Sequence, residues 1–188
     1  MSIRISSLAL DACCLINLVA AGKILRENPT KIGFSFFVPR VVAKESIYIL
    51  QPDDEQAGQL VRKEVDMNQY VDRKSVSYCD IEGGYEAALY VRFAVQLDDG
   101  EAACLAIAKS RSWILATDDR VARRLATEQS VKVLGTPEIV RTWAESNSVS
   151  DSEISSVIGN IRRYAKYAPR VNVPDAEWWY QKQLAIEC

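Results

Sequence analysis

Apolar and polar positions along the chain follow periods that predict strands alternating with helices. The segment from Ile3 to Leu10 becomes increasingly apolar and predicts a central strand. Apolar residues then recur at helical spacing from Cys14 to Val19, and Gly22 predicts the end of that helix. The segment from Ile32 to Val38 is rich in strand-forming residues, and Pro39 after it suits the first turn of a helix expected over 41–50.

The same periodicities continue through the rest of the chain. Further helices are expected over 55–68, 85–95, 101–109, 119–127 and 138–145, and further strands over 71–79, 113–117 and 131–134. Because strands alternate with helices, the pattern predicts an α/β protein in which helices cover both faces of a parallel sheet.

The C-terminal part of the chain differs in character from the alternating part. Helical segments are expected over 153–166 and 175–184, and the aromatic cluster Trp178–Tyr180 is expected to pack back onto the domain. We therefore predict a domain over 1–145 and a C-terminal helical extension over 146–188 that packs on it.

Composition limits the chemistry more than it limits the fold. The 188 residues are 48% apolar and 26% charged, which is ordinary for one globular domain. A net charge of −2 gives no bulk basicity that would indicate nucleic-acid binding. The absence of histidine excludes Ser-His-Asp triads, Cys-His dyads and most zinc hydrolase sites. Hydrolysis would therefore depend on carboxylates, thiols, Lys, Tyr or hydroxyls.

The cysteines and the hydropathy of the chain indicate the cellular compartment in which the protein is expected. Five cysteines form no Cys-x-x-Cys pair and are odd in number, which favours a reduced, cytoplasmic protein. The apolar stretch 8–21 is shorter than the roughly 20 residues of a membrane span and contains Asp11 and Asn17. We read it as a buried strand running into a helix, with no membrane partner.

Several acidic residues follow predicted strands, the position at which α/β proteins commonly bind ligands. Asp11 directly follows the first strand, and Asp118 and Asp119 directly follow the short strand expected at 113–117. In open α/β sheets, ligands bind outside the carboxyl ends of the strands. Glu45 lies about one turn into the helix after the second strand, and Glu101 begins a later helix. These acids are expected to meet in one crevice.

Such a cluster suits a hard divalent cation. Mg²⁺ prefers carboxylates, water and phosphate oxygens, and a bound metal lowers the pKa of its water and stabilises charge on a phosphoryl group. We predict Mg²⁺ or Mn²⁺ as the cofactor. The expected metal ligands are Asp11, Glu45, Glu101, Asp118 and Asp119.

Each acid also has a purely structural interpretation. Asp11 can cap the helix after it, and Glu45 can be a solvated helix residue. Asp98 and Glu101 have the spacing of a capping box. The pair at 118–119 can complement a helix dipole, and we favour one of the two as a ligand and the other as a cap.

Four segments, taken in order, resemble those of the PIN-domain family, particularly uncharacterised bacterial and archaeal PIN proteins related to VapC-type toxins. They are LALDACCLINL (8–18), VPRVVAKE (38–45), LDDGEAA (97–103) and LATDDR (115–120). By this resemblance the four catalytic acids are Asp11, Glu45, Glu101 and Asp119, with Asp118 adjacent. One departure is Asp11-Ala12-Cys13, where the family often has Asp-Thr-Asn or Asp-Thr-Ser.

The resemblance implies a three-layer α/β/α domain with a five-stranded parallel sheet. It also implies Mg²⁺- or Mn²⁺-dependent cleavage of RNA, often by a homodimer. Many relatives are toxins held in check by a small antitoxin protein, so the toxin of a toxin–antitoxin pair is a possible role. The chain is longer than the usual toxin.

A substrate surface is expected beside Asp119. Arg120, Arg123 and Arg124 are spaced i, i+3 and i+4, so one helix face can present all three to phosphates of an RNA substrate; a solvated helix face is the alternative. Two hypotheses follow for the whole protein. The first is a metal-dependent endoribonuclease, and the second is a non-catalytic PIN-like module that binds RNA or a protein.

Overall fold

A five-stranded parallel sheet forms the centre of the protein, with strand order β5-β2-β1-β6-β7. The computed structural model describes residues 5–26, 32–45, 47–53, 55–56 and 58–184. The strands of this sheet are β1 (Ser6–Leu10), β2 (Phe34–Pro39), β5 (Ser77–Cys79), β6 (Ile114–Ala116) and β7 (Val133–Leu134). The α/β class and the five-stranded parallel sheet are therefore confirmed.

The central strand β1 fixes where the first acid lies. Leu8 pairs with Phe36 of β2 on one side and with Ile114 of β6 on the other. Leu8, Ala9 and Leu10 are fully buried, because helices cover both faces of a parallel sheet. The Asp11 amide donates to the Ala116 carbonyl at 3.1 Å, so β1 and β6 end at the same edge of the sheet.

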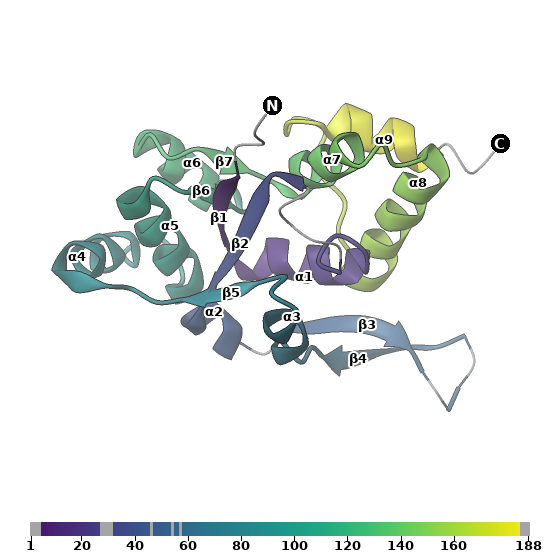
Figure 1. The fold of residues 1–188 in the computed structure, drawn as a ribbon, viewed down its shortest axis with the longest axis horizontal. Helices are drawn as coiled ribbons and strands as arrows, with labels where there is room; N and C mark the ends of the chain where they lie inside the picture. The colour runs from purple at the N-terminus through teal and green to yellow at the C-terminus, as the bar shows by residue number, and fades with distance from the viewer. Residues whose placement is uncertain (1–4, 27–31, 46, 54, 57, 185–188) are drawn as a thin grey trace.

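Helices form a layer on each face of the sheet (Figure 1). On one side lie α4 (Gly83–Phe93), α5 (Asp99–Arg111) and α6 (Arg120–Glu128). On the other lie α1 (Ala12–Ala21), α7 (Thr136–Ser146) and α8 (Asp151–Asn160). Helix α5 is buried from Ala102 to Ala108 because it lies between the sheet and α4. Gly22 ends α1 in the left-handed conformation, as the sequence indicates.

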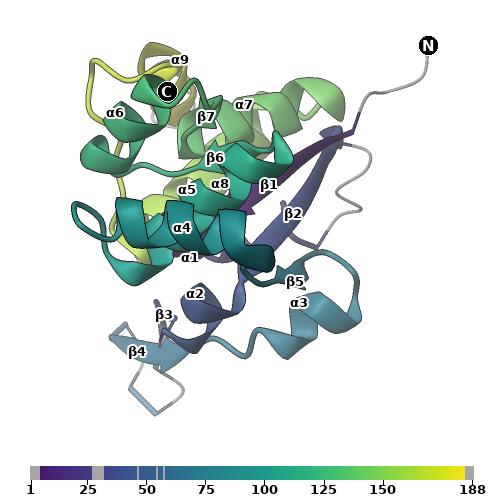
Figure 2. The ribbon, with the colours of Figure 1, turned by 90° about the vertical axis from the view of Figure 1, so that its left-hand side faces the viewer.

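The segment between β2 and β5 differs from its expected structure. It contains α2 (Arg40–Lys44), an antiparallel hairpin of β3 (Tyr48–Pro52) and β4 (Leu60–Glu64), and α3 (Asn68–Asp72). The helix expected over 41–50 is wrong after Lys44, and the helix expected over 55–68 is wrong because β4 occupies its centre. The strand expected over 71–79 is reduced to β5. The hairpin projects from the body of the protein (Figure 1 and Figure 2).

Two-residue alternation explains the first of these errors. Ile47 and Ile49 are buried whereas Tyr48 and Leu50 are partly exposed, which is the burial pattern of a strand and not of a helix. The partner strand β4 lies too far along the chain for a local periodicity to reveal the pairing.

The C-terminal extension continues from α8 into a π-helical turn, η2 (Ile161–Ala165), and ends in α9 (Ala176–Leu184). Trp179 is fully buried and meets the Tyr167 ring edge-on, with 5.9 Å between ring centroids. Trp179 therefore belongs to the hydrophobic core, and the packing of the extension 146–188 on a domain over 1–145 stays a prediction. The boundary at residue 145/146 stays a prediction. In the described part of the chain, no helix has the length and apolarity needed to cross a membrane.

Candidate functional site

Asp11 is a buried carboxylate at the carboxyl edge of the sheet. Only 2% of it is exposed, and its Oδ1 accepts the Cys14 amide at 2.9 Å, so it caps α1. The Cys13 thiol lies 3.1 and 3.2 Å from its two oxygens. Burial raises the pKa of Asp11 from 3.8 to about 7, against the opposing effect of hydrogen bonds from Thr117 and Cys14. The capping role is therefore real, and the carboxylate also borders a cavity.

Three of the four predicted catalytic acids meet around that cavity, which has a volume of about 110 Å³. Its lining consists of Asp11, Ala12, Cys13, Glu45, Asp98, Gly100 and Glu101. These residues come from three separate segments of the chain, at the ends of β1 and α2 and at the start of α5. The parallel sheet brings them together, as the position of the acids after buried strands predicts.

Glu45 lies at the end of α2 and not one turn inside a longer helix. Because α2 ends at Lys44, Glu45 has an extended backbone and approaches α5 at Gly100. A Cβ on Gly100 would stand 2.5 Å from Oε1 of Glu45, so glycine is what permits this approach. Partial burial raises the pKa of Glu45, with Asp98 and Asp99 adding to the effect.

Glu101 lies in the first turn of α5. Its amide donates to Oδ1 of Asp98 at 2.8 Å, which confirms that Asp98 caps the helix. Burial raises the pKa of Glu101 to about 7, and the neighbouring charges of Asp98, Asp119 and Asp11 contribute in that order. Glu101 is therefore electrostatically coupled to Asp11 and Asp119.

A larger cavity of about 500 Å³ adjoins the first, because Cys13 and Glu101 line both. The other residues that line it are Asp118, Asp119, Arg120, Arg123, Tyr167, Ala168, Pro169, Arg170, Asn172 and Val173. Asp119 caps α6 through Oδ1, which accepts the amides of Val121 and Ala122 at 2.7 and 2.9 Å. The fourth predicted acid thus borders the same space as Glu101.

The three predicted arginines have different environments in the structure. Arg120 is exposed and lines the larger cavity. Arg123 lines it too, but its guanidinium donates to the Thr117 carbonyl at 3.1 Å and to Glu138 at 3.2 Å. Arg124 is absent from the lining and pairs with Glu128 at 3.0 Å. The cavity therefore receives one exposed and one tethered arginine from α6.

Asp118 is held by a network that sequence reasoning did not predict. Its Oδ1 accepts the Thr136 amide at 3.0 Å and the Tyr167 hydroxyl at 2.8 Å. Its Oδ2 accepts Nδ2 of Asn17 at 3.1 Å, the Thr136 hydroxyl at 2.5 Å and the Cys14 thiol at 3.4 Å. This Asp118 network joins β6 to α1, α7 and the C-terminal extension. Asn17, polar within an apolar run, was the one local signal of it.

The chemistry of the donors decides which groups suit a metal. Within the described residues, the one group of three acidic or thiol side chains whose ligand atoms all lie within 4.8 Å of one another is Asp11, Cys13 and Cys14. For Cys13, a hydrogen bond from Cys14 acts to lower the thiol pKa, but burial and the charge of Asp11 outweigh it, and burial raises the pKa of Cys14 further. In the absence of a metal, burial thus favours the protonated form of both thiols. The carboxylates around the small cavity are the oxygen donors that a hard divalent cation prefers.

A parallel sheet with acids gathered at its carboxyl edge defines an α/β protein with a candidate ligand site at that edge. The model of the family DUF3368, described as a PIN domain, matches residues 7–170, so the chain belongs to the PIN-domain family. PIN domains are generally nucleases and typically use divalent metals. No curated protein and no solved structure matches the chain.

Proposed function

We propose that the protein is a Mg²⁺- or Mn²⁺-dependent endoribonuclease. The observation that carries the proposal is the small cavity, where carboxylates of Asp11, Glu45 and Glu101 converge from three segments. Burial raises the pKa of all three, and repulsion from neighbouring acids adds to the effect. A divalent cation would remove this repulsion, because an ion supplies the positive charge that the surrounding residues lack.

Each acid has a distinct place in the proposed site. Asp11, Glu45 and Glu101 would hold the cation from the small cavity, and Asp119 would act from the larger one. When bound, the cation lowers the pKa of a bound water and stabilises the charge that develops on the phosphoryl group. Glu101 lines both cavities and can therefore orient a water on the metal side toward a phosphodiester in the larger cavity.

The larger cavity is the proposed position of the scissile phosphodiester. Arg120 would contact a phosphate directly, because its side chain is exposed at the cavity. Arg123 would shape the wall beside it, since Glu138 and Thr117 fix its guanidinium. Arg124 lies outside the lining and is not part of the proposed contact surface.

Substitution of the acids tests the proposal. Asp11→Asn and Asp119→Asn should each abolish Mn²⁺-dependent cleavage of single-stranded RNA while leaving the circular-dichroism spectrum unchanged, because asparagine still caps a helix. Asp72→Asn is the matched control, since Asp72 is exposed on α3. Undiminished cleavage by both active-site variants would refute the ribonuclease.

The second candidate function is a non-catalytic PIN-like module that binds RNA or protein. The observation that favours it is the Cys13 thiol, which lies within hydrogen-bond distance of both Asp11 oxygens where the family often has a hydroxyl or amide residue. Calorimetric titration with Mn²⁺ separates the two functions. Saturable binding that Asp11→Asn eliminates supports the enzyme, and the absence of site-specific binding supports the module.

A further inference from the structure

The chain that follows η2 builds one wall of the candidate active-site cavity. Six residues between Tyr167 and Val173 line it, far along the sequence from the acids that border the same space. The Tyr167 hydroxyl anchors this wall on Asp118, and the Tyr180 hydroxyl donates to the Pro169 carbonyl. In Figure 2 the yellow-green segment runs beside α6, which agrees with the shared lining. The C-terminal extension therefore completes the site.

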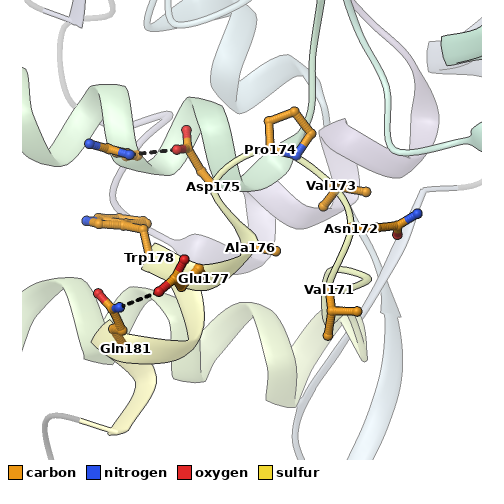
Figure 3. Close-up of a pocket in the computed structure, with 10 residues that line it drawn as sticks. Val171, Asn172, Val173, Pro174, Asp175, Ala176, Glu177, Trp178 and Gln181 are labelled. Carbon is orange, nitrogen blue, oxygen red and sulfur yellow. Dashed lines mark hydrogen bonds and ion pairs between the residues drawn. The ribbon is translucent and has the colours of Figure 1, made fainter.

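A second cavity, of about 750 Å³, lies against the same segment (Figure 3). Its lining consists of Arg141, Val171, Asn172, Val173, Pro174, Asp175, Ala176, Glu177, Trp178 and Gln181. Asn172 and Val173 also line the active-site cavity, so the two cavities are neighbours across this short stretch of chain. A ligand that crosses Asn172 and Val173 would contact both cavities.

Trp178 gives the second cavity an aromatic face. Trp179 beside it is fully buried in the core, whereas Trp178 is only partly buried and borders the open space. In Figure 3 the Trp178 ring lies on the same side of the cavity as Asp175, which pairs with Arg141, and Val171 and Asn172 lie on the other side. An indole in this position can stack a nucleobase, whatever the base, because every base has an aromatic face.

The charges of the two cavities are complementary to different parts of a nucleotide chain. In the active-site cavity, Arg120 and Arg170 are exposed, and neither forms an ion pair within the described residues. In the second cavity the Arg141 guanidinium is already paired, with Glu145 and with Asp175, at 2.7 Å each. Glu177 adds a further negative charge there. Beside the acids Glu101, Asp118 and Asp119 that also line it, the first cavity thus offers two arginines to phosphates, and the second suits an uncharged base.

We propose that segment 167–178 is a track for single-stranded RNA. Arg120 and Arg170 hold phosphates next to the scissile bond, and the base of a flanking nucleotide stacks on Trp178. This inference rests on the proposed ribonuclease function. It assigns substrate contacts to the C-terminal extension and requires an unpaired strand, because a base within a duplex cannot present its face to the indole.

A length series of RNA oligonucleotides tests the track. Fluorescence anisotropy would measure binding of labelled dinucleotides and octanucleotides, with Ca²⁺ replacing Mg²⁺ to slow cleavage. Trp178→Ala should weaken octanucleotide binding about tenfold, in keeping with the loss of one stacked base, and should leave dinucleotide binding unchanged. Trp178→Phe retains an aromatic face and should bind the octanucleotide within about threefold of the wild type. Thermal melting of each variant checks that the fold persists.

The proposed phosphate contact is tested by salt dependence. Arg170→Gln should reduce the slope of log affinity against log salt concentration by about 0.7, the value for one contact to a single strand. Arg163→Gln is the matched control, because Arg163 is exposed and lines neither cavity. An unchanged slope in Arg170→Gln contradicts this contact.

The outcomes separate the track from the proposed function. Wild-type binding that depends on Trp178, without cleavage in Mg²⁺ or Mn²⁺, supports the track and refutes the ribonuclease. Cleavage of the octanucleotide by Trp178→Ala with wild-type kcat/KM and affinity supports the ribonuclease and overturns the track. That second result would also be found if a protein partner, and not RNA, occupied the second cavity.

Discussion

Asp11 and Asp118 follow neighbouring strands at the same edge of the sheet, but their carboxylates have opposite environments. Asp118 accepts hydrogen bonds from five donors that belong to α1, α7 and the C-terminal extension. Asp11 has fewer donors and is almost completely buried, and its pKa is raised to about 7. Asp118, which is only partly buried, is held by many donors, whereas the more deeply buried Asp11 has fewer and lies where the proposed cation would bind.

The difference shows how one edge of a sheet can be stable and reactive at once. Five donors satisfy Asp118 whether or not a metal is bound, so its network can hold α1, α7 and Tyr167 in fixed positions. Burial and the charges of neighbouring acids raise the pKa of Asp11, Glu45 and Glu101, so keeping these carboxylates ionised destabilises the fold unless a cation offsets their charge. We infer that the first environment supports the second.

The largest loss of stability is expected from Asp118→Ala. The substitution leaves the donors on Asn17, Thr136 and Tyr167 without their acceptor, and orphaned buried donors are costly. We expect the free energy of unfolding to fall by about 3 kcal/mol, as measured by urea denaturation. Asp72→Ala on exposed α3 should change it by less than about 0.5 kcal/mol. Equal effects of the two substitutions would contradict a structural role for the Asp118 network.

Asp11→Asn should instead increase the free energy of unfolding of the metal-free protein. The pKa of Asp11 is about 7 in the folded chain and near 3.8 when unfolded, so the folded state binds the proton more tightly. This stabilising contribution is complete below about pH 4 and is lost as the pH rises through about 7. The asparagine side chain carries no charge at either pH and avoids the loss.

The variant should therefore match the wild type near pH 4 and exceed its stability by roughly 2 to 4 kcal/mol at about pH 8. Urea denaturation across this pH range, with a chelator present, measures the difference. Added Mn²⁺ should stabilise the wild type and not the variant. A wild type as stable as the variant at the alkaline end of the range would show that Asp11 is not strained in the absence of metal.

A smaller effect is expected from Gly100→Ala, which tests whether the position of Glu45 matters for metal binding. The new methyl group would stand 2.5 Å from Oε1 of Glu45 and 3.2 Å from a methyl of Val42. Glu45 should move out of the small cavity, and the affinity for Mn²⁺ measured by calorimetry should fall about tenfold. Gly84→Ala, where a Cβ meets nothing within 4 Å, is the control and should bind Mn²⁺ normally.

The smallest effect is expected from Tyr167→Phe. This removes one of the five donors to Asp118 and leaves the aromatic contact with Trp179 in place. The expected loss is about 1 kcal/mol in the free energy of unfolding. The double variant with Asp118→Ala should lose less than the sum of the two separate losses, because the hydroxyl and the carboxylate are partners. Additive losses would mean that the hydrogen bond contributes nothing.

The fold was predictable where burial follows a local period. Strand β1 and helix α5 contain continuous buried apolar runs, and these runs are visible in the sequence. The hairpin between β2 and β5 was not predictable. The alternation that Ile47 and Ile49 show is too short to distinguish a strand from a helix. Its stability comes from pairing with β4, a contact that no local window contains.

The candidate site was predictable only in part. Acids that follow buried strands indicate a common edge, and the structure places Asp11, Glu45 and Glu101 around one cavity and Asp119 around the next. The second half of the site depends on the path of the extension. Nothing near Tyr167 in the sequence relates it to an aspartate forty-nine residues earlier.

The π-helical turn η2 has a consequence for how tolerant the chain is to changes in length. Turns of this kind hold more residues than an α-helical turn and are often located at functional sites. Because the π-turn already holds about one residue more than an α-turn, inserting a further residue within Ile161–Ala165 would rotate the chain after it by about 100°. The Tyr167 hydroxyl would then point away from Asp118, and the wall that it anchors would be lost. We expect insertions to be harmful here, in a segment that looks like an ordinary helical tail.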